Sequence, residues 1–284
     1  MKIKKFLTNS LVHVVLAILS CVWIMPIVFA VLTSFRAESG SVKSYIIPKS
    51  FTISNYTSLF SVSVGGLTYA RWFANTLMVA IFTCVLSAFF ILSVSYALSR
   101  MRFRMRKPFM NLALILGMFP GFMSMIAVYY ILKGFGFLET GYSSLLALIL
   151  VYSGGAGLGF YITKGFFDTI PKSLDEAAYI DGCTNWQVFM KITLPLSKPI
   201  AVYTLIVSFM APWTDFIFAK VILGQNREFY TIAIGLWTML EREFVETYYT
   251  QFFAGCVLIS IPISILFLLT QKFYSDCMAG AVKG

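Results

Sequence analysis

The clearest chemical pattern in the sequence is a polar segment at 166–199, whose side chains are spaced to build short helices. Ser173 and Glu176 have the S-x-x-E spacing of a capping box, in which each side chain accepts a hydrogen bond from the other residue's backbone N–H. Asp175 adds negative charge to the same first turn, where the helix dipole favours it. The pattern predicts a short helix that begins at Ser173.

Gly182 is predicted to end this helix, because glycine readily adopts the left-handed backbone conformation found after helix C-termini. Thr184 and Gln187 repeat the capping-box spacing, and the second helix is predicted to continue until Pro195. Each cap contributes about 0.5–2 kcal/mol, which stabilises helices too short to persist alone in water. We therefore predict two short helices with a bend at Gly182.

The first short helix has a face suited to docking, which is non-covalent recognition rather than catalysis. A plain connection between two spans would not need so much local specification. Small residues at the centre of the face would let a partner approach closely. The alternative is an amphipathic helix lying on the bilayer surface. The face carries Leu174, Ala177, Ala178 and Asp181.

Asp215 is a second candidate, because its carboxylate lies inside an apolar stretch. A carboxylate at the centre of a membrane helix costs about 2.5–3.5 kcal/mol, so it usually faces the helix bundle or a water-filled cavity. Lys220 lies about 140° further around a helix and is a poor partner. With Trp213, Asp215 is predicted either to line a translocation path or to bond a neighbouring helix.

The sequence lacks the usual marks of an enzyme or a metal protein. Its five cysteines are scattered, and its only histidine is His13. No GxxxxGK[ST] stretch is present, so we expect no ATP site of the P-loop type. We predict no catalytic residue, no cofactor and no metal ion.

The elements that position these residues are predicted to be membrane helices. The chain has 284 residues, of which 59% are hydrophobic and only 12% charged, against about 25% charged in a soluble domain. A span needs about 20 apolar residues. We predict an all-α integral membrane protein, a single domain over 1–284, with six spans at 11–35, 72–98, 108–132, 142–162, 200–223 and 252–269.

Basic residues set the orientation of these spans. The net charge is +10, but Lys and Arg gather in alternate loops, which face the cytoplasm by the positive-inside rule. Both termini are therefore predicted to be cytoplasmic. We expect the chain to be embedded in the lipid bilayer and to bind no nucleic acid. The basic loops contain Lys2, Lys4, Lys5, Arg100, Arg102, Arg104, Arg106, Lys107, Lys164, Lys172, Lys191 and Lys198.

Two segments on the outer side are long enough for structure of their own. The first, 36–71, is expected to form an extended cap with a short interfacial helix. The second, 224–251, has an apolar middle at 230–237 that is too short to span the membrane. We predict that this middle contacts protein or the membrane interface.

The polar segment resembles the EAA signature of the permease subunits of bacterial ABC importers. The matching residues are Glu176-Ala177-Ala178, then Gly182, then Ile192-x-Leu194-Pro195. The resemblance covers nearly the whole chain and is nearest to the MalG-like permeases of carbohydrate importers. Further matches lie at 48–56, 96–100, 166–171 and 279–284, although Ala281 stands where that tail more often has glycine.

The resemblance implies a coupling helix that sits in a cleft of an ATPase subunit, so that ATP is hydrolysed by partners. Glu176 would meet a basic group there, and Gly182 would permit the bend. The tail at Val282, Lys283 and Gly284 would also contact the ATPase. The coupling residues would be Ser173, Asp175, Glu176, Ala177, Ala178, Asp181, Gly182, Ile192, Leu194 and Pro195.

The same resemblance implies the partners and the cargo. The partners would be a homologous MalF-like permease, two MalK-like ATPase subunits and a MalE-like solute-binding protein that contacts 224–251. The expected cargo is an oligosaccharide that is carried across the bacterial cytoplasmic membrane, and the leading candidate is maltose or maltodextrin. Another sugar or glycerol phosphate is the alternative. From other classes, an ion-coupled secondary transporter and a non-transport membrane scaffold remain open.

Overall fold

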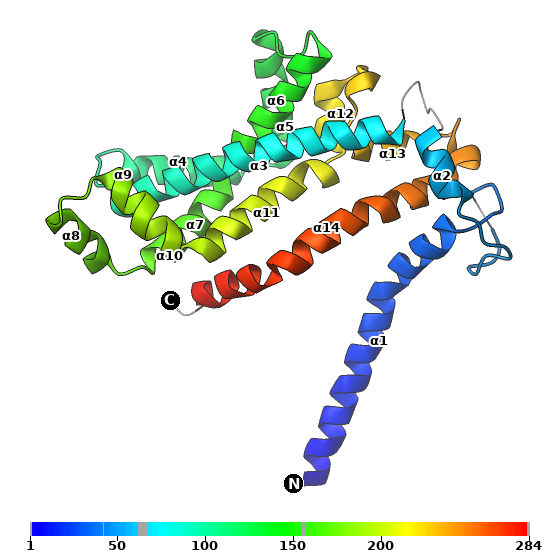
Figure 1. Cartoon of the computed structure of the whole chain (residues 1–284), viewed down its shortest axis with the longest axis horizontal. Helices are drawn as coiled ribbons and strands as arrows, with labels where there is room; N and C mark the ends of the chain where they lie inside the picture. The colour runs from blue at the N-terminus through cyan, green and yellow to red at the C-terminus, as the bar shows by residue number, and fades with distance from the viewer. Residues whose placement is uncertain (1, 42, 62–67, 155–156, 283–284) are drawn as a thin grey trace. The chain divides into compact units, whose positions relative to one another are not determined.

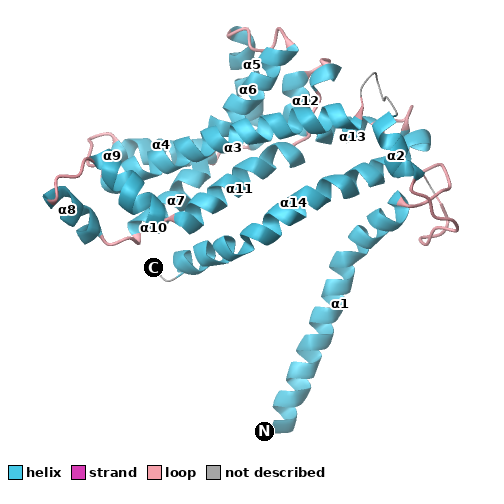
Figure 2. Cartoon of the chain, in the orientation of Figure 1, coloured by secondary structure: helices cyan, strands magenta, loops and turns pink. Residues whose placement is uncertain are grey.

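The protein is helical throughout the part described by its computed structural model, which covers residues 2–41, 43–61, 68–154 and 157–282. Figure 2 shows helices joined by loops, and within those ranges the only β-pairing is an isolated bridge between Arg36 and Phe51. The helices are α1 (Lys2–Ser34), α2 (Ser54–Ser61), α3 (Tyr69–Arg100), α4 (Arg106–Gly117), α5 (Gly121–Gly134), α6 (Gly141–Gly154), α7 (Gly157–Asp168), α8 (Lys172–Ile180), α9 (Asn185–Val188), the π-helical η1 (Phe189–Thr193), α10 (Leu194–Leu196), α11 (Lys198–Thr214), α12 (Ile217–Leu223), the 3₁₀ turn η2 (Arg227–Phe229), α13 (Ile232–Thr238) and α14 (Val245–Val282).

The all-α membrane fold predicted from the sequence is confirmed. Four stretches of the described chain are long and apolar enough to cross a membrane as single helices. They correspond to the first, second, fourth and sixth predicted spans. Their bounds are Ser10–Ser34, Tyr69–Arg100, Gly141–Asp168 and Val245–Phe273.

The third predicted span, 108–132, is a broken helix rather than a continuous one. Its halves, α4 and α5, meet at an angle of 106°. Pro120 lies at the N-cap of α5, and proline both lacks a backbone donor and disfavours helical geometry in the preceding residue. The break therefore follows from local chemistry that an apolar count does not register.

The fifth predicted span, 200–223, is also interrupted. α11 ends at Thr214, Asp215 has an extended backbone, and α12 begins at Ile217. Pro212 lies inside the last turn of α11, where it removes one helical hydrogen bond and its ring crowds the carbonyl four residues before it. At its other end α11 bends by 85° from the stretch Asn185–Leu196.

The described chain forms two compact units, so the single domain expected for 1–284 stays a prediction. The first unit is Met1–Val64 with Gly235–Pro262, and the second is Gly65–Ile234 with Ile263–Gly284. In the first, Asn55 joins three segments: its Nδ2 donates to the carbonyls of Ser34 and Arg36, both at 2.8 Å, and its Oδ1 accepts from Thr250. The short helix predicted in 36–71 is α2.

The second unit is built around α3, which packs along α11, α6 and α7 (Figure 1). At the N-terminal end of α3, the Asn75 amide donates to the carbonyls of Glu228 and Tyr230, and the Thr76 hydroxyl accepts from the backbone N–H of Ile232. At the other end an apolar cluster joins α3, α7, η1 and α11. The cluster contains Ala88, Leu92, Tyr96, Phe167, Ile170, Phe189 and Ile200. α3 is therefore the element against which the polar segment is placed.

Candidate functional site

The polar segment begins with α8, and the predicted capping box at its start is wrong. α8 starts at Lys172 with Pro171 at the N-cap, and no side chain caps it. Since the helix begins one residue before Ser173, that side chain lies inside the first turn and cannot act as the N-cap. Pro171 suits this position because its missing N–H would have no helical partner.

The end of α8 and the start of α9 agree with the sequence prediction. Gly182 has φ of 83°, the backbone N–H of Cys183 donates to the carbonyl of Ala178 at 2.9 Å, and that of Gly182 donates to Tyr179 at 3.1 Å. These two bonds form a Schellman motif. The second capping box is present between Thr184 and Gln187. The bend at Gly182 is thus fixed by hydrogen bonds on both sides.

Substituting Gly182 by alanine is expected to destabilise the protein by about 1–2 kcal/mol, because an L-residue is strained in the left-handed region. A Cβ there would meet nothing within 4 Å, so the cost comes from the backbone alone. The matched control is Gly165→Ala in α7, where a Cβ also meets nothing and alanine favours the helix. Thermal unfolding in detergent would measure both. Equal shifts would contradict the role given to Gly182.

The structure divides the predicted docking residues between two faces. Asp175 and Ala178 are buried inside the second unit, whereas Glu176, Ala177 and Asp181 are exposed. Further along, Ile192 and Leu194 are partly buried, Pro195 is exposed, and the helix runs one residue past Pro195 to Leu196. Large apolar side chains accompany Glu176 on the exposed side, with Ile180 87% accessible. We call this surface the exposed α8–α9 face; it consists of Leu174, Glu176, Ala177, Ile180 and Trp186.

Arg100, the last residue of α3, connects that helix to α8. Its Nε lies 3.1 Å from Oδ2 of Asp175, and the two side chains are only 3% and 7% exposed. Its Nη2 also donates to the carbonyls of Phe167 and Ile170, both at 2.9 Å. One guanidinium therefore holds the end of α3, the end of α7 and the first turn of α8 together.

Burial raises the pKa of the Asp175 carboxyl above its ordinary value, and the Arg100 charge opposes that rise without cancelling it. Desolvation of a buried ion pair commonly outweighs much of its Coulombic attraction. The pair therefore adds little net stability, but removing one partner alone would leave an uncompensated charge.

Two neighbours of Arg100 strengthen the same junction. The Ser99 hydroxyl donates to Oδ1 of Asp168 at 2.6 Å. The Tyr96 hydroxyl donates to the carbonyl of Asn185 at 3.1 Å, and its ring lies 4.8 Å from that of Phe189. From the sequence, Arg100 was predicted only as a basic loop residue. The available signal was the polar pair Ser99-Arg100 at the end of a long apolar run.

Asp215 lies at the break between α11 and α12 and is hydrogen-bonded from two sides. The Tyr152 hydroxyl donates to its Oδ2 at 2.8 Å, and the backbone N–H of Phe218 donates to its Oδ1 at 3.1 Å. The carboxylate thus accepts one hydrogen bond from the first turn of α12 and one from α6. Lys220 does not pair with it, since its Nζ donates to the Tyr230 hydroxyl at 2.7 Å.

A cavity of ≈ 460 Å³ lies beside this break, among α3, α6, α7, α11 and α12. Trp213 and Asp215 are absent from its wall; the Trp213 ring is buried, 5.2 Å from that of Phe73. Aromatic rings and hydroxyl groups stand out in the lining. They are Tyr152, Tyr203, Phe218, Ser87, Thr163, Thr204 and Ser208.

Replacing Tyr152 by phenylalanine is expected to destabilise the protein by about 0.5–2 kcal/mol, the range of hydrogen bonds between membrane helices. Thermal unfolding would measure the change, with Tyr142→Phe as the control because the Tyr142 side chain is exposed on the same helix. Asp215→Asn combined with Tyr152→Phe should then cost less than the sum of the two single changes. Strict additivity would contradict the pairing.

The C-terminal tail predicted to contact an ATPase is only partly described. Val282 ends α14, and Lys283 and Gly284 lie outside the described residues. The role of the tail stays a prediction.

Comparison with known proteins adds a family to this geometry. The profile of a family described as "Binding-protein-dependent transport system inner membrane component" matches residues 89–276. The galactooligosaccharides transport system permease protein GanQ of Bacillus subtilis is 34% identical, over 100% of this chain and 99% of that one. The maltodextrin permease MalD of Streptococcus pneumoniae is 32% identical over 100% and 98%.

A solved structure shows the same fold. The chain is similar to one in the crystal structure of a bacterial ABC transporter involved in the import of the acidic polysaccharide alginate. The TM-score is 0.79 at 21% identity, covering 95% of this chain and 98% of that chain.

Proposed function

Since this chain belongs to the family of binding-protein-dependent transport system inner membrane components, we propose that it is the permease subunit of an ABC importer that carries an oligosaccharide across the bacterial cytoplasmic membrane. The observation that carries this proposal is the segment Lys172–Leu196. It exposes the acids Glu176 and Asp181 together with large apolar side chains, and it is tied through a buried ion pair to the longest helix of its unit's core.

The segment Lys172–Leu196 docks on an ATPase subunit supplied by a separate chain. The exposed α8–α9 face enters a cleft of that subunit, and Glu176 pairs with a basic group there. Movement of the ATPase then pulls α8, and the Arg100–Asp175 pair passes the displacement to α3. Because α3 packs along α11, α6 and α7, it would move the walls of the 460 Å³ cavity. The chain itself catalyses no reaction.

The cavity forms part of the translocation path. Its hydroxyl groups can exchange hydrogen bonds with a sugar, and the Tyr152, Tyr203 and Phe218 rings can stack on sugar faces. Asp215 and Trp213, predicted as path residues, act behind the wall: Asp215 holds Tyr152 at the cavity edge through their hydrogen bond.

Three kinds of partner complete the transporter. A homologous MalF-like permease shares the path. Two MalK-like ATPase subunits bind the exposed α8–α9 face and the C-terminal tail at 282–284, and a MalE-like solute-binding protein contacts 224–251. In favour of the last contact, part of 224–234 is fixed to α3 by Asn75 and Thr76, which would hold it as a docking surface.

The cargo is assigned as an oligosaccharide class. The relatives named above act on galactooligosaccharides and on maltodextrin, so the maltose or maltodextrin first expected is one member of the proposed class. The lining of hydroxyls and rings suits a neutral sugar better than glycerol phosphate, since no Lys or Arg lines the cavity among the described residues.

Uptake by the reconstituted transporter would test the proposal. Vesicles containing the chain and its partners would receive labelled galactooligosaccharide, maltodextrin or glycerol phosphate, with ATP or with an imposed ion gradient. We expect ATP-dependent uptake of at least one oligosaccharide, unaffected by ionophores. Uptake driven by an ion gradient without ATP would support a secondary transporter, and uptake of glycerol phosphate alone would refute the sugar assignment.

A further inference from the structure

A basic segment at 101–107 begins directly after Arg100 and runs into the first two residues of α4. Four of its seven residues are cations: Arg102, Arg104, Arg106 and Lys107. None of the four is buried. The other three residues, Met101, Phe103 and Met105, are large, apolar and exposed, with Met105 62% accessible.

None of these four cations forms an ion pair in the described chain. The ion pairs found there join Arg100 to Asp175 and Lys164 to Asp168. The sequence contains no Asp or Glu at all between Glu38 and Glu139. The two cations at the start of α4 also lie at the positive end of that helix's dipole, which disfavours them. The segment is therefore a concentrated positive charge that an external anion would stabilise.

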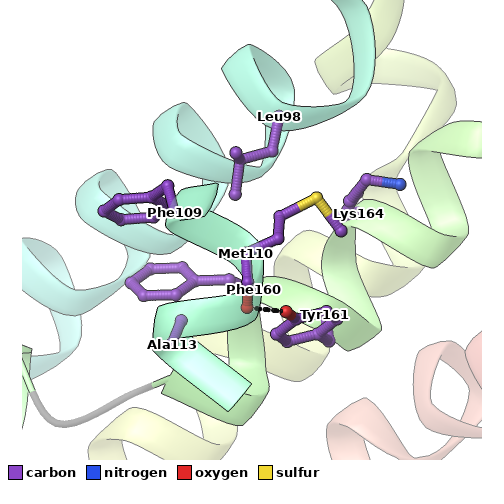
Figure 3. Close-up of a pocket in the computed structure, with 7 residues that line it drawn as sticks. All are labelled: Leu98, Phe109, Met110, Ala113, Phe160, Tyr161 and Lys164. Atoms are coloured by element: carbon purple, nitrogen blue, oxygen red, sulfur yellow. Dashed lines mark hydrogen bonds between the residues drawn. The ribbon is translucent and has the colours of Figure 1, made fainter. Parts of the chain in front are cut away.

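The surroundings of the segment are apolar, as lipid contact requires. α4 has no buried residue among those described. Where α4 rests on α7, a crease of ≈ 10 Å³ is lined by Leu98, Phe109, Met110, Ala113, Phe160 and Tyr161, with Lys164 at its edge (Figure 3). The Tyr161 hydroxyl donates to the carbonyl of Met110. The crease has room for about one water molecule, so the apolar surface next to Arg106 and Lys107 is the exposed side of α4.

We propose that residues 101–107 and the exposed surface of α4 bind an anionic phospholipid. The headgroup phosphate lies among Arg102, Arg104 and Arg106, and the acyl chains lie over the exposed apolar side chains of α4. Clusters of Lys and Arg next to a membrane helix attract anionic headgroups. An acidic protein surface would satisfy the charges, but it would leave Phe103 and Met105 without an apolar environment, which favours lipid.

Such a lipid would brace the junction that drives the transporter. Segment 101–107 follows Arg100 immediately, so a headgroup held there limits the movement of the α3 end that contacts α8. Lipid binding does not depend on which sugar is carried, and it can be measured without transport.

Lipid retention would test the proposal on the assembled transporter in nanodiscs that contain phosphatidylglycerol and phosphatidylethanolamine. Native mass spectrometry would count each lipid on the native chain and on the variant R102Q/R104Q/R106Q. We expect retained phosphatidylglycerol to fall by about tenfold or more in the variant. The charge-preserving variant R102K/R104K/R106K should retain it. The control K49Q/R71Q/K133Q, which removes three cations predicted to lie on the outer side, should also retain it.

Three results would overturn the proposal. One is equal retention of phosphatidylglycerol by the native chain and the glutamine variant. Another is displacement of the lipid by an excess of inorganic phosphate, which would indicate a site for a free anion. The third is normal lipid retention with weakened binding of the ATPase subunits, which would assign the cations to an acidic protein surface.

Discussion

Arg100→Ala is expected to lower the free energy of unfolding by about 3–5 kcal/mol, because it leaves the Asp175 carboxylate buried and unpaired. It also removes the donor to the carbonyls of Phe167 and Ile170. Thermal unfolding in detergent would measure the loss. Arg71→Ala, at the exposed opposite end of α3, is the matched control and should change stability by less than about 0.5 kcal/mol.

A double variant separates the structural role of the pair from its role in coupling. Replacing both members by apolar residues, Arg100→Met with Asp175→Leu, should recover most of the lost stability, since such exchanges are often neutral or stabilising. If the pair passes movement from α8 to α3, ATP hydrolysis in this variant should remain poorly coupled to uptake. A double variant that is stable and fully coupled would contradict that role.

Glu176→Lys is expected to reduce uptake by about tenfold or more, because like charges brought together at an interface cost several kcal/mol. Stability should change by less than about 0.5 kcal/mol, since Glu176 is exposed. The measurement is ATP hydrolysis and labelled-sugar uptake in the same reconstituted vesicles.

The control for this charge reversal is Glu139→Lys, an exposed acid in the loop after α5. It makes the same change in charge away from the exposed α8–α9 face and should leave ATP hydrolysis coupled to uptake. If both variants transported sugar normally, the docking role of Glu176 would be wrong, and the scaffold hypothesis would regain support.

Apolar length was enough to predict most of the fold. A run of about 20 apolar residues has few alternatives to a membrane helix, so four spans lie where the sequence placed them. In the other two, α4 and α5 separate at Pro120, whereas α11 continues through Pro212 and the helix is interrupted at Asp215. A hydropathy count registers neither interruption.

The site was predictable where the signal is local. The Gly182 bend and the Thr184 capping box depend on neighbouring residues and were found from spacing. The Ser173 box failed because Pro171 moved the helix start by one residue. The Arg100–Asp175 pair joins positions 75 residues apart in sequence, and no local pattern could indicate which acid a loop arginine contacts.

Cross-linking from Ile180 would test the central claim most directly, namely that the segment Lys172–Leu196 is where an ATPase subunit moves this chain. A photoactivatable amino acid would be placed at Ile180, which is 87% accessible on the exposed α8–α9 face, and irradiated in the assembled transporter. The matched position is Ile47, an exposed residue in the segment 36–71 that is predicted to lie outside the cell. We predict a covalent adduct between position 180 and the ATPase subunit, with none from position 47. An adduct from 47 and none from 180 would contradict the account.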